Sequence, residues 1–118
     1  MNEDIRIMIE IYDTHDIDWM GDIIRDPSDL TRHHIVKRED GGENGISNYA
    51  LLTNLSHTLL HYLEDNYNKE YNYLNSKFLE LNRSLSPPTT EYYEDVHKVL
   101  KSVKKRIKNG NRSLKRKR

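Results

Sequence analysis

Cysteine is absent from the 118-residue sequence. Its absence excludes disulfide bonds and thiolate zinc sites, so any metal must be held by His, Asp, Glu or Asn side chains. No apolar run approaches the roughly 18–20 residues that span a bilayer, and we expect no transmembrane helix and no membrane partner. The opening residues MNEDIRIMIEIYD are acidic and lack the basic stretch of a secretory signal, which predicts a cytoplasmic location.

Acidic residues are absent from the last part of the chain. From Val96 onward there are eleven Lys or Arg residues and no Asp or Glu, although the formal net charge of the whole chain is zero. Residues 1–31 carry the opposite bias, with nine acidic residues against Arg6 and Arg25. Such blocks are often solvated faces or frayed tails, but a basic terminus also favours contact with phosphate groups. Both interpretations stay open at this point.

The length fits one domain, and an apolar fraction of 35% fits a modest core. Over residues 5–12 every second residue is isoleucine, as in a half-buried strand, but apolar residues also recur there at helical spacing. The β-branched side chains favour the strand. The acidic stretch 13–29 contains Gly21 and the turn sequence DPSD, and we expect a short helix and a loop.

A hairpin and three helices are predicted for the rest. Residues 30–36 and 49–53 are typical of strands, and the polar, glycine-rich stretch 37–45 joins them. Asn54 or Ser56 can cap the helix that follows. Apolar residues recur at three- and four-residue steps over 67–85, and the sequence SPPT ends that helix. Thr90 can cap a last helix, which should end at Asn109-Gly110.

Four of the six histidines lie between residues 33 and 61. His57 and His61 are four residues apart on a predicted helix, so their imidazoles project from one face and suit a single metal ion. His33 and His34 are neighbours at a strand end and should point to opposite faces. One of them can complete a metal site while the other addresses a substrate. Partly buried core histidines and surface loop histidines are the plainer alternatives.

Residues 31–64, TRHHIVKREDGGENGISNYALLTNLSHTLLHYLE, resemble the HNH (ββα-metal) nuclease family, in particular the short HNH proteins common in phages and prophages. The matching features are His-His-Ile, Gly-Gly in the turn, Ile-Ser-Asn before an apolar strand, and His57 with His61 on the next helix. The resemblance implies an α+β fold: a small ββα-metal core, made of the hairpin plus a helix, with flanking α-helices. It also implies a metal-dependent endonuclease that hydrolyses DNA phosphodiester bonds in a bacterial or phage-infected host cell.

The resemblance covers residues 30–64, and with the charge blocks and apolar spacing around it the chain is expected to divide into four segments. These are an acidic N-terminal extension over 1–29, the HNH core over 30–66, two packing helices over 67–108 and a basic disordered tail over 109–118. Many relatives clamp the core with a zinc held by four cysteines. That clamp is missing here, so the flanking helices must stabilise the hairpin by packing.

Roles for five residues also follow from the resemblance. His34 corresponds to the general base, and Asn48 to the asparagine that braces the loop and orients the base through backbone hydrogen bonds. His33, His57 and His61 correspond to the ligands of one divalent cation. A neutral imidazole can take a proton from water near neutral pH, which suits His34 to its role. The family reaction leaves 5′-phosphate and 3′-hydroxyl ends.

The identity of the metal stays open among Mg²⁺, Mn²⁺, Zn²⁺ and Ni²⁺. Three imidazoles favour Zn²⁺, Ni²⁺ or Co²⁺, whereas family members often work with Mg²⁺ or Mn²⁺, which prefer oxygen ligands. Asp29, Asp40 or Glu43 could supply an oxygen, but no spacing singles one out.

DNA is the expected partner. Basic residues that can contact its phosphates lie beside the histidine doublet and near the end of the chain: Arg32, Lys37, Arg38, Lys104, Lys105, Arg106 and Lys108. Exposed loop charges explain the first three equally well. Two other hypotheses remain. An HNH scaffold could bind DNA or a protein without cleaving, or the acidic N-terminal segment could fold over the basic tail and mimic DNA.

Overall fold

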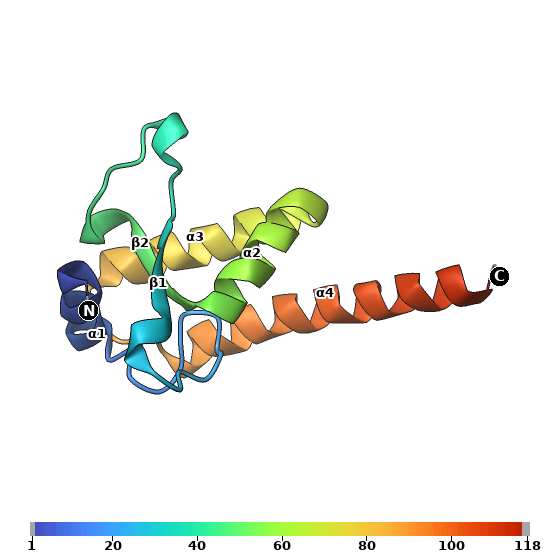
Figure 1. Cartoon of the computed structure of the whole chain (residues 1–118), viewed down its shortest axis with the longest axis horizontal. Helices are drawn as coiled ribbons and strands as arrows, with labels where there is room; N and C mark the ends of the chain where they lie inside the picture. Colours follow the sequence, from blue (N-terminus) through green and yellow to red (C-terminus); the bar gives the residue numbers. More distant parts are fainter. Residues whose placement is uncertain (1, 117–118) are drawn as a thin grey trace.

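The computed structural model describes the backbone of residues 2–116 and the side chains of residues 2–110. The described residues form an α+β fold of four α-helices around one antiparallel hairpin (Figure 1). The elements in chain order are α1 (Glu3–Tyr12), η1 (Pro27–Asp29), β1 (Leu30–His34), η2 (Arg38–Asp40), η3 (Ile46–Asn48), β2 (Tyr49–Thr53), α2 (Asn54–Asn66), α3 (Asn68–Ser84) and α4 (Thr90–Arg116). No helix of the described part is both long and apolar enough to cross a bilayer.

The hairpin lies at the centre of the fold. β1 pairs with β2 in antiparallel register, from Leu30 opposite Thr53 to His34 opposite Tyr49. β2 matches the strand predicted at 49–53, and every one of its residues is buried. β1 is two residues shorter than predicted, because after His34 the chain leaves the ladder for the loop that contains η2 and η3.

The strand predicted over 5–12 is wrong, since this segment forms α1. The residues that α1 buries are spaced for a helix: Ile5, Met8, Ile9 and Tyr12. Asn2 caps it by accepting a hydrogen bond from the N–H of Ile5 at 3.2 Å. A helix satisfies its own backbone groups, whereas a strand would need a neighbouring strand to pair with. The described chain pairs only β1 with β2 as named strands.

The acidic segment after α1 is built into the core. Trp19 and Asp18 are fully buried. The Asp18 carboxylate accepts hydrogen bonds from the N–H groups of Met20, Asp22 and Thr53 at 2.8–2.9 Å. Thr53 is the residue at which β2 passes into α2, so the N-terminal segment helps to hold that junction. The N-terminal segment is therefore part of the hydrophobic core.

The remaining helices cover the hairpin and differ from prediction at their ends. Thr53, rather than Asn54 or Ser56, caps α2 by accepting from the N–H of Ser56 at 3.2 Å. Thr89 rather than Thr90 caps α4, accepting from the N–H of Tyr92 at 3.1 Å. α4 does not end at Asn109-Gly110 but continues to Arg116, through most of the tail predicted to be disordered, and residues 117–118 lie outside the described part. Its C-terminal half projects beyond the other elements (Figure 1).

Candidate functional site

All four histidines of the sequence pattern line one pocket of about 570 Å³. β1, the loop after it, α2 and the start of α3 contribute its walls. The lining residues are Arg32, His33, His34, Lys37, Arg38, Glu39, His57, His61, Glu64 and Tyr71. The pocket thus brings the adjacent pair on β1 together with the pair on α2, although more than twenty residues separate them in sequence.

The two histidines of β1 differ in environment, as alternation along a strand requires. His33 is 4% exposed and faces α2 and α3. Its Nε2 donates a hydrogen bond to Oδ1 of Asn75 on α3 at 2.8 Å, which leaves the lone pair on Nδ1. Burial lowers the pKa of His33 to about 4. The ring is therefore neutral at physiological pH, as a metal ligand must be.

The two histidines of α2 stack one turn apart. Their ring centroids are 4.8 Å apart and their planes differ by 19°. The Thr31 hydroxyl donates to the carbonyl of Leu52 at 2.8 Å and lies 2.7 Å from Nδ1 of His57. Because its proton is already engaged, Thr31 accepts from the Nδ1–H of His57, and Nε2 of that ring keeps its lone pair. Burial, followed by the charge of His61, lowers the pKa of His57.

His34 is half-buried, and the ring contacts that join His33 to His57 and His57 to His61 do not include it. Its Nε2 is 2.8 Å from Oδ1 of Asn44, and its ring meets that of Tyr49 edge-on at 5.1 Å. Asn48 was expected to brace the loop and to orient this base through backbone hydrogen bonds. Asn44, which the pattern did not single out, contacts the ring.

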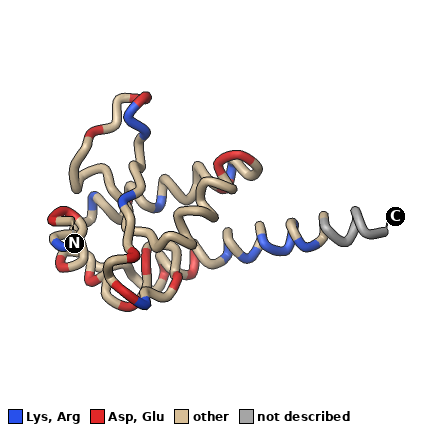
Figure 2. Tube along the Cα trace, viewed as in Figure 1, with Lys and Arg blue, Asp and Glu red and all other residues tan. Residues whose placement is uncertain are grey.

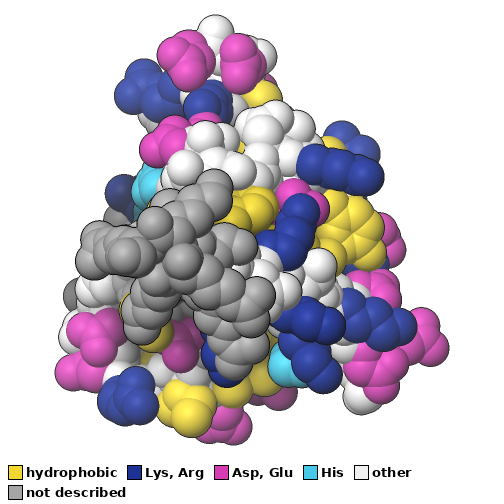
Figure 3. All heavy atoms as spheres, turned by 90° about the vertical axis from the view of Figure 1, so that its right-hand side faces the viewer, with side chains coloured by type: hydrophobic (Ala, Val, Ile, Leu, Met, Phe, Trp, Pro, Cys, Tyr) yellow, Lys and Arg dark blue, Asp and Glu magenta, His cyan; other side chains and the backbone are white. Residues whose placement is uncertain are grey.

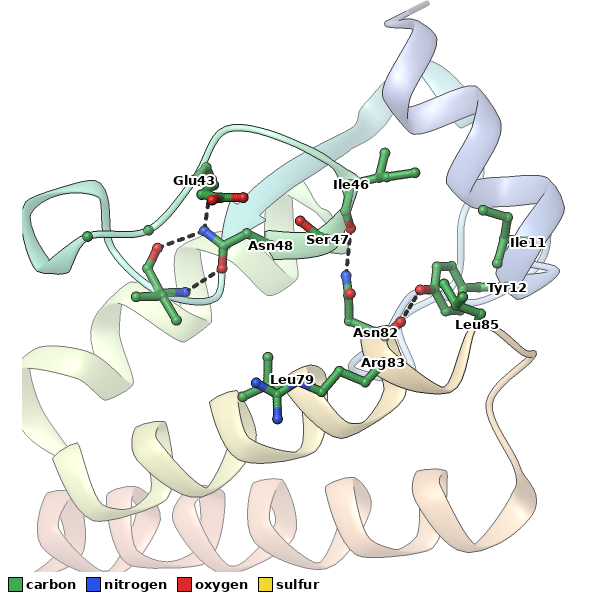
Figure 4. A pocket seen from close by; sticks show the side chains of 13 residues that line it. Ile11, Tyr12, Glu43, Ile46, Ser47, Asn48, Leu79, Asn82, Arg83 and Leu85 are labelled. Atoms are coloured by element: carbon green, nitrogen blue, oxygen red, sulfur yellow. Dashed lines mark hydrogen bonds between the residues drawn. The ribbon is translucent and has the colours of Figure 1, made fainter.

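Asn48 braces the loop that follows His34 (Figure 4). Its Oδ1 accepts from the N–H of Val36 at 2.9 Å, and its Nδ2 donates to the carbonyls of Val36 and Glu43 at 2.9 and 3.0 Å. The Asn48 carbonyl also accepts from the N–H of Ile35 at 2.9 Å. These backbone hydrogen bonds fix the chain directly after His34, so Asn48 acts on the position of His34 rather than on its ring.

Glu64 also lines the pocket, although the histidine pattern did not predict it as a site residue. Its Oε1 is 3.4 Å from Nδ1 of His61, and its Oε2 forms an ion pair with Lys37. Lys37, then His61, lowers the pKa of Glu64, which keeps it a carboxylate near neutral pH. The overlooked signal was spacing, because His57, His61 and Glu64 lie at i, i+4 and i+7 on one helical face. The oxygen donors considered earlier, Asp29, Asp40 and Glu43, are not among the lining residues.

The predicted phosphate-binding residues fall into two groups. Lys37 and Arg106 are engaged, since Lys37 pairs with Glu64, and Arg106 pairs with Glu70 at 2.7 Å while lying over the ring of Tyr67. The other five are exposed: Arg32, Arg38, Lys104, Lys105 and Lys108. The last three lie on the projecting half of α4, where Lys and Arg follow one another without an acidic residue (Figure 2). Seen from the side toward which α4 points, basic and acidic side chains are interspersed over the surface (Figure 3).

The donor atoms of the pocket do not meet at one point in this structure. Within residues 2–110, no three His, Cys, Asp or Glu side chains form a ready metal cluster. The rings of His33 and His57 lie edge-on with centroids 5.8 Å apart. The His61 side chain is 60% exposed and is therefore the one with room to turn.

Comparison of the chain with protein-family models, with curated proteins and with solved structures finds no match in any of the three.

Proposed function

We propose that this protein is a metal-dependent endonuclease of the HNH type that hydrolyses DNA phosphodiester bonds. The observation that supports it is the single pocket lined by His33 and His34 of β1 and by His57 and His61 of α2. The hairpin-plus-helix order is the one that the resemblance implies. The ββα-metal core is part of the proposal.

The donor types suit one divalent cation, although the His61 ring, which stacks on that of His57, would have to turn to share it. A metal–nitrogen bond of about 2.1 Å places two imidazoles on one ion with centroids no more than roughly 6.5 Å apart. His57 lies within that limit of both His33 and His61, at 5.8 and 4.8 Å. The hydrogen bond of His33 to Asn75 and that of His57 to Thr31 each leave one lone pair on the ring for a metal ion. A cation held there would polarise a phosphoryl oxygen and stabilise the charge that develops during hydrolysis.

His34 is the general base in this proposal. It stands on the other side of β1 from His33, so it can address a water molecule without joining the ligand set. Its imidazole accepts the proton of the attacking water, and Asn44 holds the ring while it does so. Asn48 fixes the chain after His34 and so preserves the geometry on which proton transfer depends.

The basic half of α4 is the proposed contact for the DNA backbone. Lys104, Lys105 and Lys108 are exposed there, and Arg106 ties the helix to α3 through Glu70. Arg32 and Arg38 line the pocket and can contact phosphates nearer the reacting bond. Contacts to phosphate are sequence-independent, so they position the duplex without selecting a site.

The projecting basic helix also favours a second function, a module that binds DNA on an HNH scaffold without cleaving it. The two functions differ in one assay. Supercoiled plasmid is incubated with the protein after chelator treatment, alone and with Mg²⁺, Mn²⁺, Zn²⁺ or Ni²⁺. The endonuclease nicks or linearises the plasmid only when metal is present, and His57→Ala loses this activity while His97→Ala, altered outside the pocket, keeps it. Retarded plasmid mobility with no nicking under any metal would support the binding module instead.

A further inference from the structure

Glu64 lines the pocket but has no role among the proposed general base and metal ligands. It follows His61 by three residues on α2, and its side chain is only 18% exposed, against 60% for that of His61. Lys37, from the loop after β1, pairs with its Oε2. Its Oε1 lies 3.4 Å from Nδ1 of His61. The less exposed carboxylate thus stands beside the most exposed histidine ring of the pocket.

We propose that Glu64 is the positioning residue for His61: it accepts a hydrogen bond from Nδ1–H and leaves the lone pair on Nε2 for a cation. This inference rests on the proposed function for the purpose of that lone pair. A neutral imidazole carries one N–H and one lone pair, so an acceptor held at one nitrogen determines which nitrogen can bind a metal.

The other two expected ligands show the same arrangement. Thr31 holds Nδ1 of His57, and Asn75 holds Nε2 of His33. Each of the three rings therefore has one oxygen partner, each from a different residue. A ligand ring commonly donates its second N–H to a carboxylate, a carbonyl or water, and loss of that partner weakens metal binding. Glu64 completes this set for the one ring that neither β1 nor α3 supports.

Lys37 has a part in this arrangement. Because Lys37 engages Oε2, the carboxylate presents Oε1 to His61 rather than turning into the pocket as a ligand. The ion pair also joins the loop after β1 to α2 across the pocket. Lys37 was expected to contact phosphate. In this proposal its charge instead holds the Glu64 carboxylate in place.

The first test reads the ring of His61 directly. Nitrogen-15 NMR at pH ~8.5, where imidazoles are neutral, distinguishes Nδ1–H from Nε2–H. We expect Nδ1–H in the wild type and in Glu64→Gln, which keeps an acceptor oxygen, but Nε2–H, which an unconstrained histidine side chain prefers, in Glu64→Met. The matched control is Glu39→Met, which changes the other carboxylate that lines the pocket. Nε2–H in the wild type, or an unchanged pattern in Glu64→Met, would overturn the proposal.

The second test measures Ni²⁺ affinity by calorimetry, with circular dichroism to verify that each variant is folded. Glu64→Met should weaken binding about 10- to 100-fold. In a His61→Ala background the same substitution should change nothing, because Glu64 acts through that ring. An equal loss in both backgrounds would make Glu64 a direct ligand and overturn the positioning role. A wild type that binds no Ni²⁺ would overturn the metal site itself, whereas normal Ni²⁺ binding with an unchanged His61 tautomer in Glu64→Met would overturn the role of Glu64 alone.

Discussion

The side-chain amide of Asn48 holds the backbone of Val36 at both of its polar groups. Oδ1 accepts from the Val36 N–H, and Nδ2 donates to the Val36 carbonyl, each at 2.9 Å. The side chain thus satisfies the backbone N–H and carbonyl of Val36, as a neighbouring strand would in a sheet. It does so two residues after His34, at the point where β1 has ended.

Asn48→Ala should therefore destabilise the protein by about 2 kcal/mol, because three hydrogen bonds to the loop are lost and each contributes about 0.5–1.5 kcal/mol. Urea unfolding followed by circular dichroism measures the change. Asn44→Ala, at an exposed asparagine of the same loop, is the comparison and should cost less than about 0.5 kcal/mol. Equal losses in the two variants would mean that the brace contributes nothing beyond an ordinary loop contact.

Gly42 is required because the loop folds back against the carbonyl that Asn48 binds. A Cβ at this position would lie 1.8 Å from the oxygen of Val36 and 2.9 Å from Nδ2 of Asn48. We expect Gly42→Ala to cost about 1–3 kcal/mol in unfolding free energy, since backbone must move to make room. Gly45→Ala is the control in the same loop, where a Cβ meets nothing within 4 Å. If both variants unfold at the wild-type urea concentration, the Val36 carbonyl does not lie close enough to residue 42 to require glycine there.

The sequence was sufficient to predict the helices and strands whose apolar residues follow one clear spacing. Apolar residues at three- and four-residue steps identified α3, and a short apolar run after a polar turn identified β2. α1 was mistaken for a strand because its isoleucines satisfy both periods. Two features favour the helix: the cap at Asn2 and the absence of a partner strand in the described chain. The absence of a partner strand depends on the tertiary structure and could not be predicted from this segment alone.

The same limit applies to the candidate site. The four histidines could be chosen from spacing and resemblance, and one pocket receives all of them. The hydrogen-bonding partners of these histidines could not all be predicted in this way. Asn75 reaches His33 from 42 residues away, across a contact that depends on how α3 packs on the hairpin. Thr31 and Glu64 were within reach of pattern analysis, since Thr31 shares a strand face with His33 and Glu64 shares a helix face with His61.

Buried His33 predicts a specific loss of stability in acid. Its folded pKa of about 4 lies below the ordinary value of 6.5, so the unfolded chain takes up the proton first as the pH falls. Stability is lost as the pH drops below about 6.5 and is restored above it; between pH 7 and pH 5 this group should account for about 2 kcal/mol.

Urea unfolding of wild type and His33→Gln at several pH values isolates this contribution. The variant carries no titratable group at residue 33, so its stability should fall less steeply on acidification. Parallel curves for the two proteins would show that His33 is protonated in the folded state as readily as in the unfolded chain.

DNA affinity should depend on the projecting half of α4. Replacing Lys104 and Lys105 by Gln should weaken binding to duplex DNA and flatten the slope of log K against log salt by roughly two, since each phosphate contact contributes about 0.9. A charge-matched control replaces Arg6 and Arg25, which lie in the acidic N-terminal segment. Fluorescence anisotropy over a range of salt concentrations measures both. The same slope in the two double variants would show that α4 contributes only net charge.

The most direct measurement of the central claim is single-turnover cleavage of supercoiled plasmid by the wild type and by His34→Ala, with Ni²⁺ affinity measured on the same preparations. Loss of the general base should lower the cleavage rate at least about 100-fold and leave Ni²⁺ affinity unchanged, because His34 stands apart from the three expected ligands. His97→Ala, on α4 and outside the pocket, should cleave at the wild-type rate. Cleavage by His34→Ala at the wild-type rate would contradict the account.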